Sequence, residues 1–89
     1  MTNDFIVCNV QTFVLHSSVE VYKNKEKVAS KACLINDIAK TAVEEAYLNS
    51  IDQIYLTGNV LYAETVQRYI REENVLNYNN KKEIKVDLI

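Results

Sequence analysis

The stretch IYLTGNVLYAE, residues 54–64, contains the only glycine of the 89-residue chain, and the hydrophobic pattern changes there. Before Gly58 lies a short apolar run, typical of a strand that reaches the core through Ile54 and Leu56. After it, apolar residues recur three or four positions apart, which indicates an amphipathic helix over residues 60–73. The apolar side of that helix is expected to carry Leu61, Tyr62, Val66, Tyr69 and Ile70. The stretch therefore predicts a strand, a corner and a helix.

The segments on either side of this stretch supply the other elements. Residues 5–10, FIVCNV, form an almost continuous apolar run, which is typical of a strand buried on both faces. The polar residues 23–26, KNKE, indicate the turn of a hairpin. The remaining predicted elements are strands over 12–22 and 27–34, a helix with Asn36 as its N-cap that stops at residues 49–50, and a final strand over 83–89.

This order, β-β-(β)-α-β-α-β, predicts an α+β fold with a single mixed β-sheet. Strands of a hairpin pair antiparallel, whereas strands joined through a helix pair in parallel by right-handed crossovers. The two helices are expected to pack on one face of the sheet. Because 89 residues make one domain, residues 1–89, too little chain is left to cover the other face.

Composition excludes several classes of function. Ten basic and twelve acidic residues give a net charge of −2, so no overall positive field attracts nucleic acid or acidic lipid. No apolar run approaches the roughly 20 residues of a membrane-spanning helix. The first ten residues lack the features of a secretory signal, and we expect a cytoplasmic protein without a membrane partner.

The residues that carry chemistry in other proteins are sparse. Cys8 and Cys33 have neither metal-ligand nor redox spacing, so we expect buried, reduced thiols. His16 is the only histidine, and it lacks the partners that a metal site requires. On a strand, Ser17 would point to the opposite face from His16, and no oxyanion-donating loop accompanies Ser18. The sequence thus predicts no enzymatic activity and no cofactor.

The element order resembles that of the ribonuclease H-like fold and the related actin-like ATPase subdomains. IYLTGN resembles the strand end that lies beside the nucleotide in the actin-like group, and the resemblance extends over residues 5–70. Asn59 stands where the actin-like pattern repeats glycine, and NVQT at residues 9–12 replaces the acidic, glycine-containing phosphate loop. Asn9 or Gln11, and Thr57, occupy the regions where ribonuclease H-like nucleases need carboxylates. The resemblance implies a shared fold without the residues that bind phosphate in the one group or catalyse hydrolysis in the other.

The shortage of chain to cover the first strand favours a small protein-binding module that also forms a homodimer. An adaptor or inhibitor from a phage or mobile element fits the size and composition, and the sequence does not identify its protein partner. Tyrosine is common both at core boundaries and at protein interfaces. The expected interface residues are aromatic, namely Tyr47, Tyr62, Tyr69 and Phe13.

Two other functions remain open. Thr57, Gly58 and Asn59 precede a helix N-terminus, where backbone N–H groups can hold a nucleotide or phosphate. The same residues also suit a tight corner with a cap provided by Asn59 or Thr57. The third function is nucleic-acid binding through a lysine hairpin, comprising Lys23, Lys25 and Lys27. Exposed lysines there also suit a solvated turn that discourages aggregation of sheets, which is the reading that we favour.

Overall fold

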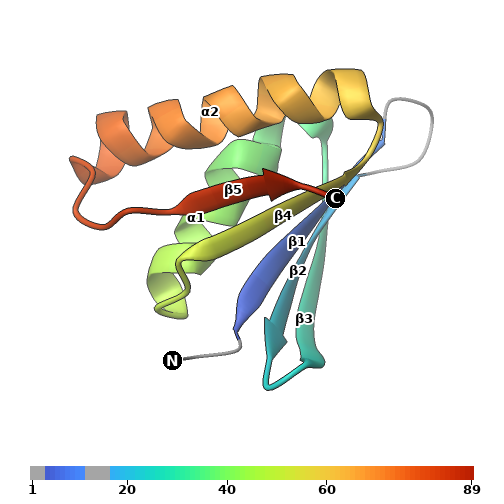
Figure 1. Ribbon diagram of the computed structural model, residues 1–89, viewed down its shortest axis with the longest axis horizontal. Coiled ribbons are helices and arrows are strands. Elements are labelled where there is room, and N and C mark those ends of the chain that lie inside the picture. The colour runs from blue at the N-terminus through green and yellow to red at the C-terminus, as the bar shows by residue number, and fades with distance from the viewer. Residues whose placement is uncertain (1–3, 12–16) are drawn as a thin grey trace.

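A five-stranded mixed sheet carries two helices on one face in the computed structural model, which describes residues 4–11 and 17–89 (Figure 1). The strand order is β3-β2-β1-β4-β5, and the predicted α+β fold class is confirmed. The elements are β1 (Phe5–Val10), β2 (Ser17–Lys23), β3 (Glu26–Cys33), a 3-10 turn (Ile35–Asp37), α1 (Ile38–Leu48), β4 (Gln53–Gly58), α2 (Val60–Tyr78) and β5 (Lys85–Leu88).

The pairing of the strands follows from their connections. β1 pairs antiparallel with β2 and β2 with β3, whereas β4 lies parallel to both β1 and β5. Asn24 and Lys25 form the β2–β3 turn with φ values of 52° and 68°. Positive φ at both central residues is the geometry of a type I′ turn, whose twist matches that of the flanking strands. The predicted hairpin is therefore present.

The edge strand β3 contains a β-bulge. Val21 lies opposite Ala29 and Tyr22 lies opposite Lys27, so Val28 is an extra residue of β3 without a partner in the register. A bulge bends the strand and interrupts its ladder of hydrogen bonds. The long outer edge of the sheet is thereby made irregular next to the hairpin turn.

Two helix boundaries differ from the prediction. Asn36 is not an N-cap, because the 3-10 turn occupies its position and α1 starts after Asp37 without a side-chain cap. α2 does not end near residue 73 but continues to Tyr78, where Asn79 with φ of 53° ends it. α2 extends further because Asn74 is buried and hydrogen-bonded, although its polar side chain suggested an exposed loop.

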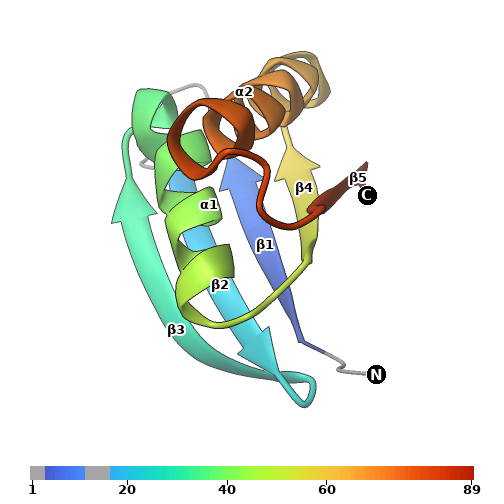
Figure 2. The ribbon, with the colours of Figure 1, turned by 90° about the vertical axis from the view of Figure 1, so that its left-hand side faces the viewer.

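The core lies between the sheet and the helices (Figure 2). On β1, Ile6, Cys8 and Val10 are fully buried, whereas Phe5 and the other alternate residues are only half-buried. The expectation that β1 is buried on both faces is therefore wrong. Because both helices pack on one face, only the side chains on that face reach the core. Figure 2 shows α1 and α2 together on that side of the strands.

Gly58 makes the corner between β4 and α2. Its φ is +101°, and a Cβ atom built there would lie 2.3 Å from the carbonyl oxygen of Val10 on the neighbouring strand. The same oxygen accepts a hydrogen bond of 2.9 Å from the N–H of Asn59. Asn59 then caps α2, because its side chain accepts from the N–H groups of Leu61 and Tyr62. Glycine is required here by both conformation and space.

We expect Gly58→Ala to lower the free energy of unfolding by at least about 2 kcal/mol, because it adds backbone strain to a steric clash. Chemical denaturation measures this. The control is Thr57→Ala, which shortens a half-buried side chain on the same strand and should cost less than about 1 kcal/mol. Equal losses in the two variants would contradict the structural role of Gly58.

Candidate functional site

The outward side of α2 is the most exposed apolar surface of the described chain. Leu61 and Leu76 are 79% and 76% exposed, and Tyr62 and Tyr69 are 49% and 47% exposed. We define the α2 stripe by seven exposed residues of this helix: Leu61, Tyr62, Arg68, Tyr69, Glu72, Val75 and Leu76. It is apolar at each end and charged in the middle.

The residues predicted to form the apolar side of α2 fall into a buried group and an exposed group in the structure. Val66 and Ile70 are buried against the core, together with Ala63, whereas Tyr62 and Tyr69 are exposed. The periodicity alone could not separate these groups, because apolar residues occupy more than half of the helix circumference. Leu76 was missed because the helix was predicted to end too early. Its spacing of seven from Tyr69 was a signal that could have revealed it.

Tyr47 lies away from the α2 stripe, in contacts within its own chain. Its ring stacks on that of Tyr78 with centroids 4.2 Å apart, and its hydroxyl donates a hydrogen bond to the buried Asn74 side chain. The backbone N–H of Lys82 donates to the same hydroxyl at 3.3 Å. Tyr47 thus joins α1 to α2 and to the segment between α2 and β5. Phe13, the fourth predicted interface residue, and His16 lie outside the described residues.

Lys82 completes this cluster. Its Nζ lies 4.8 Å from the centre of the Tyr47 ring and donates a hydrogen bond of 2.7 Å to the carbonyl of Ala46. A cation suits the carbonyl end of α1, where the helix dipole is negative. Burial lowers the pKa of Lys82, while Asp52 acts in the opposite direction. The contacts are those of a structural clamp.

We expect Tyr47→Phe to lower the free energy of unfolding by about 1–3 kcal/mol, because Asn74 loses a buried hydrogen-bond partner. The matched control is Tyr69→Phe, which removes an exposed hydroxyl and should change stability by less than about 0.5 kcal/mol. Both are compared by denaturation at one sub-micromolar protein concentration, where contacts between chains do not contribute to stability. An unchanged Tyr47→Phe variant would argue against the clamp.

The Thr57–Gly58–Asn59 corner has fewer groups available for an anion than its sequence suggested. The N–H groups of Leu61 and Tyr62 already donate to Asn59 Oδ1, at 3.1 and 3.4 Å. Thr57 is half-buried and lies opposite Asn9 across the β1–β4 ladder. The geometry accounts for these residues as a corner and a cap, and phosphate binding stays a prediction.

The lysine hairpin carries acidic residues among its cations. Lys27 Nζ lies 3.1 Å from Glu20 Oε2, and this hydrogen bond and charge raise the pKa of Lys27. Glu26 stands between Lys25 and Lys27 at the start of β3. Nucleic-acid binding by Lys23, Lys25 and Lys27 also stays a prediction. The acidic residues among these lysines reduce the local positive charge and so do not support it.

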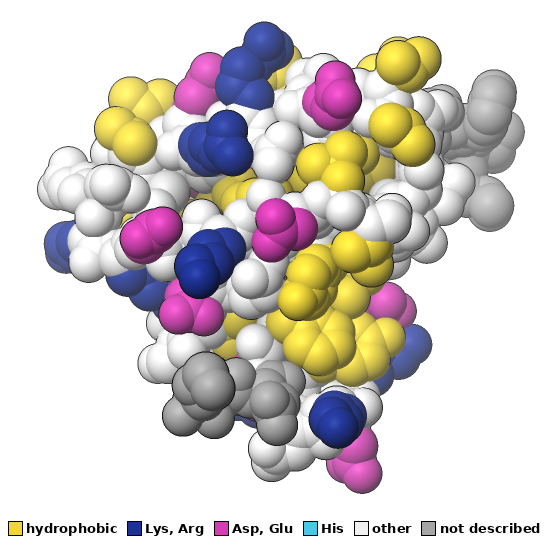
Figure 3. Space-filling view, viewed as in Figure 1, with side chains coloured by type: hydrophobic (Ala, Val, Ile, Leu, Met, Phe, Trp, Pro, Cys, Tyr) yellow, Lys and Arg dark blue, Asp and Glu magenta, His cyan; other side chains and the backbone are white. Residues whose placement is uncertain are grey.

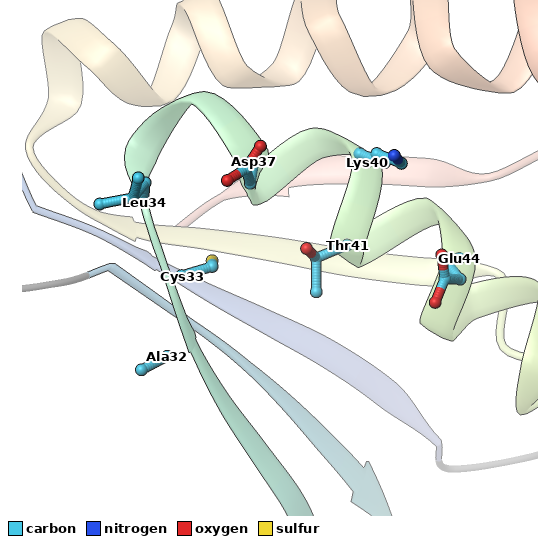
Figure 4. A pocket seen from close by; sticks show the side chains of 7 residues that line it. All are labelled: Ala32, Cys33, Leu34, Asp37, Lys40, Thr41 and Glu44. Atoms are coloured by element: carbon cyan, nitrogen blue, oxygen red, sulfur yellow. The ribbon is translucent and has the colours of Figure 1, made fainter.

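A groove of about 570 Å³ runs between the end of β3 and the start of α1 (Figure 4). Its lining residues are Ala32, Cys33, Leu34, Asp37, Lys40, Thr41 and Glu44. Burial, and then the negative charge of Asp37, raise the pKa of the Cys33 thiol, so it stays neutral at neutral pH. Cys8 is fully buried, and burial raises its pKa as well. Neither thiol is poised as a nucleophile.

The uncovered face of the sheet carries an aromatic cluster. The ring of Phe5 stacks on Tyr22 at 4.8 Å and meets the edge of Tyr55 at 5.5 Å. Figure 3 shows hydrophobic side chains gathered where β1 and β2 lie in Figure 1. All three rings are only half-buried, and each is partly covered by its neighbours in the cluster. The face as a whole is mixed in character, because Asn9, Glu20 and Thr57 lie on it beside the rings.

The described ranges, 4–11 and 17–89, contain neither a metal cluster nor a helix that could span a membrane. Within them, no group of three or more His, Cys, Asp or Glu residues is placed to hold a metal ion. No helix in the same ranges combines the length and apolar character needed to cross a membrane. In comparisons with known proteins, no family model matches the chain, and the search of curated proteins finds no match.

Proposed function

We propose that the chain is a small, non-enzymatic protein-binding module that associates with itself as a homodimer. The observation that carries this proposal is the exposure of the α2 stripe. Of eleven exposed large apolar residues in the described chain, six lie on this 19-residue helix. Exposed apolar area of this kind marks contact sites for other proteins, because its removal from water is favourable.

The composition of the stripe supports a protein partner. Tyrosine and arginine are enriched at the centres of interfaces, and Arg68 and Tyr69 lie at the middle of the stripe. The guanidinium of Arg68 lies 5.5 Å from the centre of the Tyr69 ring. The aromatic cluster around Phe5 is a weaker candidate, because its rings already bury one another.

The cysteines and the order of the elements bear on the compartment of the protein and on the fold that it resembles. Two free cysteines suit a reducing compartment, which supports a cytoplasmic adaptor or inhibitor. The order of three strands, helix, strand, helix and strand supports the resemblance to the ribonuclease H-like fold. Asn9 and Thr57 lie opposite each other on β1 and β4, where such nucleases would need carboxylates. This pairing supports a protein that binds rather than hydrolyses.

Light scattering at increasing micromolar concentration tests self-association. We expect a species of twice the 10.2 kDa mass of one chain, in reversible equilibrium with the monomer. Tyr69→Ala and Leu76→Ala should each raise the dissociation constant about tenfold or more, because interface anchors contribute over about 1.4 kcal/mol.

The matched control is Leu48→Ala, which truncates a side chain 70% exposed on α1 and should leave the dissociation constant unchanged. A chain that stays monomeric at hundreds of micromolar would refute the homodimer. Equal weakening by all three variants would show that the contact does not depend on α2.

A further inference from the structure

The α2 stripe has a direction that restricts how two copies can meet. Tyr62, Tyr69 and Leu76 recur at steps of seven residues, so they lie on one side of the helix. From Tyr62 to Leu76 the stripe is about 21 Å long at 1.5 Å per residue. Such a stripe fits a second helix packed along it.

The two apolar ends of the stripe suit contact with each other. At the C-terminal end, Arg71, Glu72, Val75 and Leu76 surround a shallow hollow of about 300 Å³. At the N-terminal end, Leu61 is the most exposed of the large apolar residues in the described chain. An exposed side chain from the N-terminal end can lie in this hollow when the second helix runs in the opposite direction.

The charges in the middle of the stripe favour the same arrangement. Arg68 and Glu72 lie one turn apart, and neither forms an ion pair within the described chain. With Tyr69 opposite the partner's Tyr69, Arg68 comes within about 3 Å, measured along the axis, of the partner's Glu72. The two-fold axis repeats this contact, which gives two opposite-charge pairs. A parallel pairing would instead set like charges at the same level.

We propose that two copies of the chain pair their α2 stripes antiparallel, about a two-fold axis beside Tyr69. This inference rests on the proposed self-association and adds its geometry. Leu61 and Tyr62 of one copy occupy the hollow beside the partner's Leu76, and Arg68 pairs with the partner's Glu72. One helix per subunit makes a small interface, so the dimer is expected to dissociate in the micromolar range.

Cysteine cross-linking under mild oxidation tests the direction, in a Cys33→Ala background that removes the half-buried thiol and keeps the buried Cys8. Tyr69→Cys should cross-link to itself at concentrations where light scattering finds a dimer. Tyr62→Cys alone should not, because the two copies of residue 62 lie about 21 Å apart, far beyond disulfide reach. A mixture of Tyr62→Cys and a size-tagged Leu76→Cys should give the mixed product.

Charge reversal provides a second test that does not alter Tyr69. Arg68→Glu and Glu72→Arg should each weaken the dimer about tenfold, and the double variant should restore it. Unfolding midpoints of the monomers, measured below the dissociation constant, separate changes within the helix from changes between subunits.

The outcomes distinguish the geometry from the proposed function. A dimer in which Tyr62→Cys cross-links to itself, or in which the double charge reversal fails to recover affinity, overturns the antiparallel pairing and leaves self-association intact. A chain that is monomeric at every concentration overturns both. A dimer with the three expected cross-linking results and the charge rescue supports the pairing.

Discussion

The approach of Gly58 to the carbonyl oxygen of Val10 sets the position of most of the second half of the molecule. β1 and β4 are adjacent parallel strands, and they end together at this point. Because Gly58 has no side chain, the N–H of Asn59 can reach Val10 and the amide of Asn59 can cap α2. One close contact thus places the first turn of a 19-residue helix. The direction of that helix then decides which residues are buried under it and which face outward.

The local patterns were sufficient for the order of elements and for most of their bounds. Ile54 and Leu56 occupy alternate positions on β4, and the structure buries both. The corner at Gly58 was predictable because no other residue tolerates such a backbone at low cost. The hairpin was predictable from its polar turn, although a type I′ turn at Asn24 and Lys25 lacks the glycine that usually marks it.

Contacts between distant segments account for what the sequence could not predict. Asn74 is buried because its amide donates to Asn80 and to the carbonyl of Lys82, and accepts from Tyr47. Nothing local distinguishes this asparagine from the exposed ones that follow it. The exposure of Tyr62 and Tyr69 has the same origin, since Ala63 lets α2 approach the sheet on a neighbouring arc. Which arc is buried depends on packing rather than on periodicity.

The bulge at Val28 bears on how far any assembly of this chain can grow. A regular outer strand would accept another strand, and each addition would expose a new edge, which is the route to filaments. β3 interrupts its ladder and carries Lys25, Lys27 and Lys31 at or near that edge, while β5 on the opposite edge is only four residues long. A two-fold symmetric contact between two α2 helices buries the same surface on both chains. Neither chain then has that surface available for a third chain. The bulge in β3 and the shortness of β5 thus oppose the addition of further strands at the sheet edges. The proposed contact between α2 helices gives a dimer and no larger assembly.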